Sequence, residues 1–237
     1  MIKPLLIIFW LMLINGDCFA QNKDQPLKGI FVALNRTTAE INSDYIESVK
    51  PDYSTNLKIG YLMERINKNG IVTETGVLLT KNGFNYELNN IYDDNSQSLL
   101  SYEERLTIYY LEVPFTFKKY FIINEKSSFF IKGGLGFNLL LYTEYISKLK
   151  NISKSESRSA SFRYQIFDVV MGKPNTNAIN FIDAKLLLVA GFSLISGEFL
   201  IQPQVGYGYG IIDITSATGK LENRELTIGF TVGKKLF

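Results

Sequence analysis

The sequence predicts an all-β protein, an eight-stranded antiparallel up-and-down transmembrane β-barrel with short periplasmic turns and longer extracellular loops. Three observations support this fold class: an export signal at the start, a strand at the end of the chain, and connections that alternate between short and long. The last stretch, Arg224 to Phe237, places Leu226 and other apolar residues on one face and Thr227 and other small or polar residues on the opposite face. Side chains alternate sides in a strand, so this pattern is typical of a closing barrel strand.

The start of the chain has the features of a secretory signal peptide. An apolar run of about ten residues, Leu5 to Ile14, follows a basic residue, and small residues at Cys18 and Ala20 predict cleavage after Ala20. The run is shorter than the roughly 20 apolar residues of a membrane-spanning helix. Cys18 raises the alternative of lipoprotein acylation, but the residues before it lack the small apolar pattern of such sites. We therefore expect a signal peptide at residues 1–20 and one outer-membrane β-barrel domain at residues 21–237.

Eight segments alternate with a period of two residues and are predicted to be the strands. The first, Leu27 to Arg36, has an ambiguous facing because Ile30 and Phe31 are both large and apolar. The other seven run from Thr55 to Ile66, Ile71 to Lys81, Leu106 to Tyr120, Phe129 to Tyr142, Asp183 to Ser196, Phe199 to Ile211 and Arg224 to Phe237.

Each of these seven segments has one apolar face. In chain order, these faces begin with Leu57, Ile59, Tyr61 and Met63, then Val77 and Leu79, then Tyr109, Leu111, Val113, Phe115 and Phe117. They continue with Ile131, Leu135, Phe137, Leu139 and Leu141, then Leu186, Leu188, Phe192 and Leu194, then Ile201, Val205, Tyr207 and Tyr209, and finally Leu226, Ile228, Phe230 and Val232. We expect these faces to contact lipid and the opposite faces to line the barrel.

The connections between the segments are sorted by length. The short ones are Asn67 to Gly70, whose Asn-Gly is a hairpin signal, Ile122 to Ser128, and Ser196 to Glu198. The long, polar ones are Thr37 to Ser54, Asn82 to Arg105, Thr143 to Ile182 and Asp213 to Asn223. A membrane barrel with short periplasmic turns and long extracellular loops produces this alternation.

One further segment, Ser159 to Gly172, is apolar enough to be a strand. As a ninth membrane strand it would leave the two chain ends on opposite sides of the membrane. We interpret it instead as a loop element, a hairpin extending above the membrane. A ten-stranded barrel would need one more strand, for which Phe84 to Tyr92 is a poor candidate.

The polar face is rich in glycine and carries charges that would each cost roughly 2–4 kcal/mol at the bilayer midplane if they faced lipid. These charged residues are Glu64, Glu74, Glu112, Lys118, Lys132, Lys185 and Glu225. Pointing inward, they can pair, and we expect a contact between Glu112 and Lys132. An eight-stranded barrel is just wide enough for its own side chains, which favours a salt-bridged plug over a polar channel.

Aromatic residues near the strand ends fit the interfacial girdles of a membrane barrel. They are Tyr61, Tyr109, Tyr120, Phe121, Phe129, Tyr142, Tyr207 and Tyr209.

The sequence predicts no catalytic, cofactor-binding or metal-binding residue. It contains no histidine, which removes Ser-His-Asp and Cys-His arrangements and the usual general base. The acidic pairs Asp93-Asp94 and Glu103-Glu104 are interpreted as solvated loop residues. The formal net charge of +2 gives no electrostatic basis for binding nucleic acid. We therefore expect a protein that is not an enzyme and needs no cofactor.

Parts of the sequence resemble a known family. The run Tyr109-Tyr110-Leu111-Glu112-Val113-Pro114, the run Phe130 to Gly136 and the ending Ile228 to Phe237 are similar to small outer-membrane β-barrel proteins of the PorT-like type. The resemblance implies an eight-stranded outer-membrane barrel. PorT itself is linked to protein secretion, but most members have no assigned activity, so we do not transfer that role.

Together these patterns predict a non-enzymatic barrel exported to a Gram-negative outer membrane, with a structural or interaction role through its extracellular loops, mainly Thr143 to Ile182. The alternatives are a soluble lipocalin-like ligand-binding barrel and a narrow channel for ions or small solutes. The expected partners are outer-membrane lipid, the barrel-assembly machinery that reads the last strand, and an extracellular or secretion-system protein. Counting by twos from Leu226 puts Phe237 on the polar side, so either a bulge at Gly233 to Lys235 resets the alternation or Phe237 lies beyond the ladder.

Overall fold

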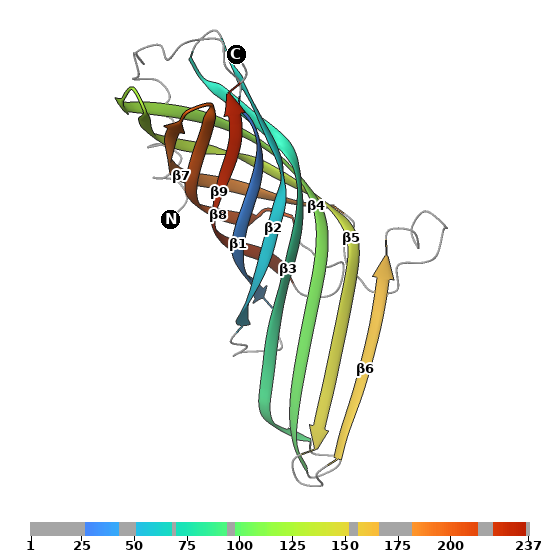
Figure 1. The fold of residues 1–237 in the computed structure, drawn as a ribbon. Coiled ribbons are helices and arrows are strands. Elements are labelled where there is room, and N and C mark those ends of the chain that lie inside the picture. Colours follow the sequence, from blue (N-terminus) through green and yellow to red (C-terminus); the bar gives the residue numbers. More distant parts are fainter. Residues whose placement is uncertain are drawn as a thin grey trace.

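Eight strands close into an antiparallel barrel, as the sequence predicts (Figure 1). The structure is a computed structural model that describes residues 27–42, 51–67, 70–93, 98–151, 156–165, 182–212 and 220–235. Its strands are β1 (Leu27–Asn42), β2 (Pro51–Ile66), β3 (Val72–Asp93), β4 (Ser98–Asn124), β5 (Ser127–Asn151), β6 (Glu156–Gln165), β7 (Ile182–Ser196), β8 (Phe199–Gly210) and β9 (Lys220–Lys235). The barrel order is β1-β2-β3-β4-β5-β7-β8-β9, and β9 pairs with β1. No helix among these residues is long and apolar enough to cross a bilayer.

The stagger of the strands sets the dimensions of the barrel. Paired residues followed once around the wall from Lys28 pass through Met63, Thr75, Phe115, Leu135, Leu186, Tyr209 and Arg224, and return to β1 at Thr38, ten residues further along. With strands about 4.8 Å apart and a rise of about 3.3 Å per residue, this stagger tilts the strands by about 40°. Eight strands at this tilt enclose a lumen that side chains can fill.

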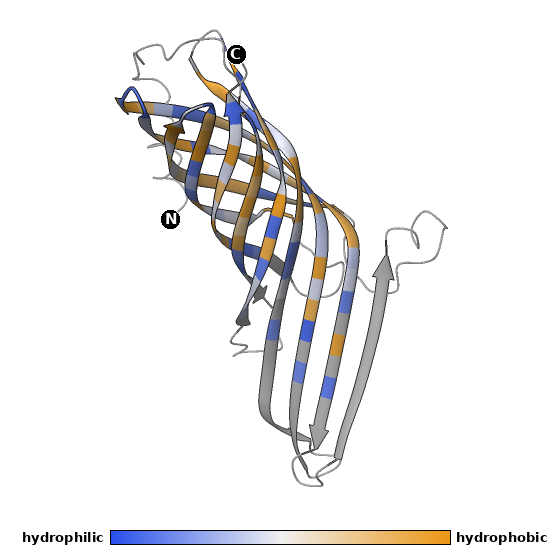
Figure 2. Cartoon of the chain, in the orientation of Figure 1, coloured by the Kyte–Doolittle hydropathy of each residue, from blue (hydrophilic) through white to orange (hydrophobic). Residues whose placement is uncertain are grey.

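The two faces of the wall have opposite chemistry, and hydrophobic and hydrophilic residues alternate along the barrel strands (Figure 2). The apolar faces predicted for β2 to β5 and β7 to β9 do point outward, since none of their residues is buried. In β1, Ile30 and Leu34 face outward while Phe31 and Ala33 are buried. The outward residues include Leu57, Ile59, Met63, Val77, Leu79, Val113, Phe115, Phe117, Phe137, Leu186, Leu188, Phe192, Leu194, Ile201, Val205, Leu226, Ile228 and Phe230. The soluble lipocalin-like alternative is therefore wrong, because it needs these faces to line an internal cavity.

The three predicted short connections are tight turns at one end of the barrel, called here the turn end. The turns follow Ile66 in β2, Asn124 in β4 and Ser196 in β7. Gly70 and Gly197, in the first and third, have φ values of 74° and 61°, which lie in the left-handed region where glycine has no steric penalty. β1 begins and β9 ends at this same end, since Leu27 pairs with Lys235. The opposite end, where the long connections lie, is called the loop end.

The described parts of two long connections are strand, which corrects the prediction that residues 82–105 and 143–182 are loops. β3 and β4 remain paired from Asn82 with Ile108 to Asp93 with Ser98, and β4 and β5 remain paired up to Leu100 with Asn151. The sequence does not reveal this pairing, because apolar and polar residues stop alternating where the strands leave the membrane. We call residues 87–93, 98–105, 143–151 and β6 the extension (Figure 1).

β6 explains the apolar segment that did not fit the eight-strand count. It pairs with β5 from Tyr142 with Gln165 to Asn151 with Glu156, beyond the point where β7 pairs with β5. The interpretation as an element above the barrel therefore holds for residues 159–165, and residues 166–172 lie outside the described part of the chain. The ten-strand alternative is wrong, because the closed wall has eight strands.

The closing strand has no bulge at its end. β9 pairs with β1 without a register shift from Lys220 to Lys235, and with β8 from Arg224 to Lys234. The bulge proposed for residues 233–235 is therefore wrong. Phe237 and the predicted signal peptide both lie outside the described residues.

The register at the closing seam can be tested with cysteines. Leu34 and Ile228 are cross-strand partners, and both are exposed on the outer face. We expect Leu34→Cys combined with Ile228→Cys to form a link upon oxidation or with a short thiol crosslinker, because partner Cβ atoms lie about 5 Å apart. Non-reducing gel mobility of the unfolded protein reports this link.

The matched control combines Leu34→Cys with Thr227→Cys, one residue out of register. Thr227 faces the lumen, so this pair should not link in the folded barrel. Equal linking in the two variants would contradict the register, since a slip of one residue exchanges the two faces.

Candidate functional site

The candidate site is the charged interior of the barrel. All seven charged residues predicted to face inward are buried, with at most 4 % of their surface exposed. The structure adds Lys58, which is 3 % exposed, and Asp183, which is 0 % exposed. Both follow the same alternation in β2 and β7, so the sequence signal that identifies the other seven also identifies these two. The lysines and glutamates form two clusters, stacked along the barrel axis.

The cluster nearer the turn end is built around Lys118 on β4. Its ammonium contacts Glu64, lies 2.9 Å from Glu74 Oε2 and donates to Gln202 Oε1 at 3.0 Å. The Glu74 carboxylate also binds the Lys132 ammonium at 2.5 Å. We call Glu64, Glu74, Lys118 and Lys132 the turn-side cluster.

Two further groups support the turn-side cluster. The Tyr120 hydroxyl donates to Glu64 Oε2 at 2.9 Å and accepts from Gln202 Nε2 at 2.7 Å. The Lys118 ammonium also lies 4.4 Å from the centre of the Phe130 ring, a cation–π contact. Tyr120 was expected in an outer girdle, and that expectation is wrong because its hydroxyl belongs to this interior network.

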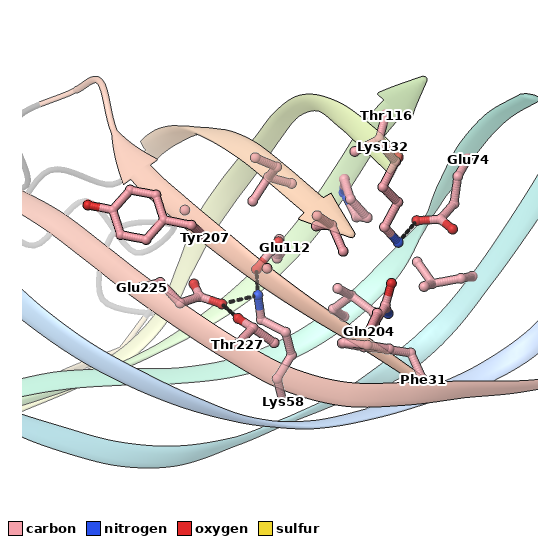
Figure 3. Close-up of a pocket in the computed structure, with 17 residues that line it drawn as sticks. Phe31, Lys58, Glu74, Glu112, Thr116, Lys132, Gln204, Tyr207, Glu225 and Thr227 are labelled. Atoms are coloured by element: carbon pink, nitrogen blue, oxygen red, sulfur yellow. Dashed lines mark hydrogen bonds and ion pairs between the residues drawn. The ribbon is translucent and has the colours of Figure 1, made fainter. Parts of the chain in front are cut away.

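The cluster nearer the loop end is a closed ring of two lysines and two glutamates. Lys58 Nζ lies 2.8 Å from Glu112 Oε2 and 2.5 Å from Glu225 Oε1. Lys185 Nζ lies 2.8 Å from Glu112 Oε2 and 2.5 Å from Glu225 Oε2. We call these four residues the loop-side cluster, and Figure 3 shows Lys58 reaching between the two carboxylates.

Hydroxyl groups complete the coordination of the loop-side carboxylates. Thr80 donates to Glu112 at 3.1 Å, and Thr227 donates to Glu225 at 2.6 Å. Charged groups taken out of water are tolerated only when partners replace their hydration. Each cluster contains equal numbers of lysines and glutamates, so its members compensate one another.

The predicted contact between Glu112 and Lys132 does not form. Glu112 pairs in register with Asn138, whereas Lys132 pairs with Lys118, six residues away along β5. At a rise of about 3.3 Å per residue this separation is too long for a salt bridge. The two residues therefore belong to different clusters, and the stagger of the strands decides their partners.

A small cavity separates the two clusters. Its volume is about 50 Å³, and Lys58, Glu112 and Glu225 line one side while Glu74 and Lys132 line the other (Figure 3). Thr116 Oγ1 and Gln204 Oε1 belong to residues that line it, and both atoms are buried without a hydrogen-bond partner among the described residues. The lining also includes apolar residues such as Leu62 and Leu78, and a cavity of this size has room for a few ordered waters beside its polar groups.

Outside the two clusters, polar side chains that are mostly amides continue the interior toward the loop end. Asn35 donates to Asn82 at 2.9 Å, and Asn138 donates to Asp183 at 3.0 Å. Beside the clusters, Phe31, Leu62 and Leu78 form a small apolar cluster together with Ala33. The cross-section is therefore filled by ion pairs, amides and apolar side chains.

The aromatic girdle at the turn end is a row of contacting rings. Phe121 and Phe129 have ring centres 6.1 Å apart, and those of Phe129 and Phe192 are 5.5 Å apart. At the loop end Tyr109 and Tyr142 lie 5.7 Å apart. These rings mark the two ends of the apolar band.

The described residues contain no group of three or more acidic, histidine or cysteine residues suited to a metal ion. Glu103, one of the acidic residues considered in the sequence, binds Lys148 at 3.3 Å, and Asp94 lies outside the described part of the chain. Both side chains of the Glu103–Lys148 pair are more than half exposed, so it contributes little to stability.

Comparison with known proteins gives one family and several similar structures. Residues 19–216 match the family model described as outer membrane protein beta-barrel domain. No curated protein matches the sequence.

Three solved structures illustrate the similarity. Ail of Yersinia pestis in complex with a heparin analogue, sucrose octasulfate, is 13% identical, with 88% of this chain and 98% of that chain covered and a TM-score of 0.35. OprG of Pseudomonas aeruginosa is 10% identical, with 89% and 96% covered and a TM-score of 0.39. The outer membrane protease OmpT of Escherichia coli is 9% identical, with 93% and 99% covered and a TM-score of 0.39. These similarities carry no information on binding or catalysis.

The mutual dependence of the charges predicts the effect of removing one of them. Lys118→Met should lower the free energy of unfolding by about 3–5 kcal/mol, because Glu64 is left buried without a cation. Lys118→Met combined with Glu64→Gln removes both charges and should recover about half of that loss. Urea titration followed by gel mobility measures both variants, and a double variant no more stable than the single one would contradict the ion-pair account.

The cavity predicts the effect of a second variant. An apolar group that fills a dry cavity raises the free energy of unfolding, but here we expect a decrease. Thr116→Val keeps the shape of the side chain but removes a buried hydroxyl from a residue that lines the cavity. If the cavity holds water, the variant should lower the free energy of unfolding by about 1–2 kcal/mol, because a water loses a partner. Thr75→Val, on the outer face of β3, is the control. An unchanged or raised stability of Thr116→Val would mean that the cavity is dry.

Proposed function

The chain belongs to the outer membrane protein beta-barrel domain family, and from this membership we propose that it is a non-enzymatic barrel with a closed lumen that presents its extension to a protein partner outside the cell. Family membership places the barrel in the outer membrane, where its apolar outer face contacts lipid. The interaction role, the closed lumen and the absence of catalysis form the proposal.

The extension is the observation that supports the interaction role. A connection that only joins two membrane strands needs a few residues, but here β3, β4 and β5 continue beyond the barrel and β6 pairs alongside β5. The pairing runs across β3, β4, β5 and β6, as in the row of Glu87, Glu103, Lys148 and Ser159. A backbone paired in this way holds its residues in fixed positions, which favours recognition by a surface over recognition by separate loops.

The two charge clusters support a structural barrel over a channel. The turn-side cluster spans from β2 and β3 to β4 and β5, and Gln202 on β8 contacts it across the lumen. The loop-side cluster joins β2, β4, β7 and β9 in the same way. A permeating ion would have to break these contacts, so we propose that the resting barrel does not conduct.

The proposal that the protein is not an enzyme rests on its chemistry, since the barrel fold also occurs in proteases such as OmpT. The sequence has no histidine. The buried lysines and glutamates are bound to one another, and a carboxylate held by two ammonium groups is a weak general base. No pair of groups in the described lumen is poised to activate a nucleophile.

Three finer assignments are also part of the proposal. Residues 1–20 are removed as a signal peptide and residues 21–237 form the mature barrel. The chain is of the PorT-like type, an assignment that the run Tyr109 to Pro114 supports. The barrel-assembly machinery recognises the closing strand, β9, and a secretion-system component is one class of partner for the extension.

Shortening the extension tests the interaction role. The residues between Glu87 and Glu103, and those between Ser147 and Ala160, can each be replaced by Asn-Gly, because both flanking pairs are in register and accept a two-residue turn. A photoreactive amino acid at Arg105, which remains exposed, should form a crosslink to a defined partner in cells only when the extension is intact.

Two controls make the result interpretable. The shortened barrel should keep its heat-modifiable gel mobility, since the membrane strands are unchanged. The same photoreactive residue at Lys126, in the β4–β5 turn at the opposite end, should not crosslink to that partner. A folded, shortened barrel that still crosslinks to the same partner through residue 105 would contradict the proposal.

A further inference from the structure

Three basic residues gather on the outer face at the turn end, around the seam where the barrel closes. Lys28 on β1 is the cross-strand partner of Lys234 on β9 and of Met63 on β2. Arg65 lies two residues beyond Met63 on the same face of β2. All three side chains are exposed. We call Lys28, Arg65 and Lys234 the basic patch.

The basic patch carries an excess of positive charge. Like charges directly opposite each other on one face of a sheet are destabilising, and diagonal neighbours lie only about 7–8 Å apart. The carboxylate of Glu198, in the β7–β8 turn, lies 2.8 Å from Lys234 Nζ. Among the described residues, Lys28 and Arg65 form no ion pair. Two of the three cations are therefore free to bind a negative partner outside the described chain.

The surroundings of the patch indicate where that partner lies. Its neighbours on the outer face are apolar and exposed: Ile30 is 59%, Met63 is 40% and Phe199 is 53% exposed. Phe199 is the cross-strand partner of Lys234. Long basic side chains at the border of an apolar band extend their charged ends to the level of the lipid headgroups.

The loop end of the same strands is arranged differently. There Arg36 stacks on the Tyr53 ring at 4.0 Å and Arg224 on the Tyr209 ring at 5.7 Å. The register also places Glu40 opposite Glu222, two residues beyond the pair of Thr38 and Arg224. Aromatic rings thus accompany the arginines at the loop end, whereas the basic patch has an excess of cations.

We propose that the basic patch binds the phosphate group of an anionic phospholipid in the leaflet at the turn end, the periplasmic leaflet of the outer membrane. The guanidinium group of Arg65 offers paired N–H donors to phosphate oxygens, and the ammonium groups of Lys28 and Lys234 add charge-assisted hydrogen bonds. The acyl chains lie against the apolar face beside Ile30. A bound lipid removes the repulsion between Lys28 and Lys234 and so stabilises the β1–β9 seam.

Native mass spectrometry of the full-length mature protein in detergent, titrated with phosphatidylglycerol or phosphatidylcholine, tests this site. Lys28→Gln combined with Arg65→Gln removes two cations and leaves the pair of Lys234 and Glu198 intact. We expect this variant to bind the first phosphatidylglycerol roughly 20-fold more weakly, since each basic residue near an anionic headgroup contributes about a factor of five. Binding of phosphatidylcholine should change less than twofold.

The matched control is Lys126→Gln combined with Lys148→Gln, which removes the same charge at exposed positions away from the patch. It should keep the affinity of the unmodified protein for phosphatidylglycerol. In the unmodified protein, raising the salt concentration tenfold should weaken phosphatidylglycerol binding and spare phosphatidylcholine binding. This measurement needs no variant to fold.

Three results would overturn the site. An equal loss of phosphatidylglycerol in the control variant would mean that overall charge governs binding. Displacement of the lipid by millimolar inorganic phosphate would identify a free-anion site. Binding of phosphatidylglycerol that salt does not weaken would remove the electrostatic basis. The lipid titration does not require the protein partner of the extension, so the site and the proposed interaction role can fail separately.

Discussion

The pairing of β9 with β1 is the contact on which the rest of the structure depends. Backbone amide and carbonyl groups have no water to bind in the hydrocarbon core, so a membrane-spanning sheet must have no free edge there. The sixteen pairs between Leu27–Asn42 and Lys220–Lys235 remove that edge. They also fix the stagger of ten residues, and the stagger fixes the tilt, the radius and the set of side chains that meet inside.

The interior follows from that geometry and from the alternation of side chains. Facing lipid, each of the eight charged residues in the two clusters would carry a large desolvation cost; facing inward, Lys58 and Lys185 share the same two carboxylates. Glycine makes room where neighbouring strands approach closely. A Cβ atom at Gly134 would collide with the Phe115 carbonyl group on the neighbouring strand. Shape and charge therefore close the lumen together.

The alternation of residues predicts the direction of side chains well, because it depends only on neighbours along the chain. It correctly places Glu74, Lys118 and Glu225 inside, and it finds all three short turns. It fails for the partner of Glu112, because the contact with Lys185 depends on the register of three strands, which no single segment encodes. Tyr120 was misassigned for a related reason, since its hydroxyl binds Glu64, a residue 56 positions away in sequence.

The extension shows a second limit of sequence reasoning. Beyond the membrane both faces of a strand tolerate mixed residues, so residues 87–105 read as a loop although their backbone is paired. That sheet and the ion-paired lumen are the two features from which we propose a barrel that displays a surface and does not pass solutes.

Conductance across a planar bilayer tests the closed lumen most directly. The folded mature protein, inserted alone into an anionic bilayer, should show no steady open level at either polarity, because ion pairs block the path at two depths. Stable, ohmic current steps whose number grows with the amount of inserted protein would contradict this account. Such steps would identify the barrel as a narrow channel.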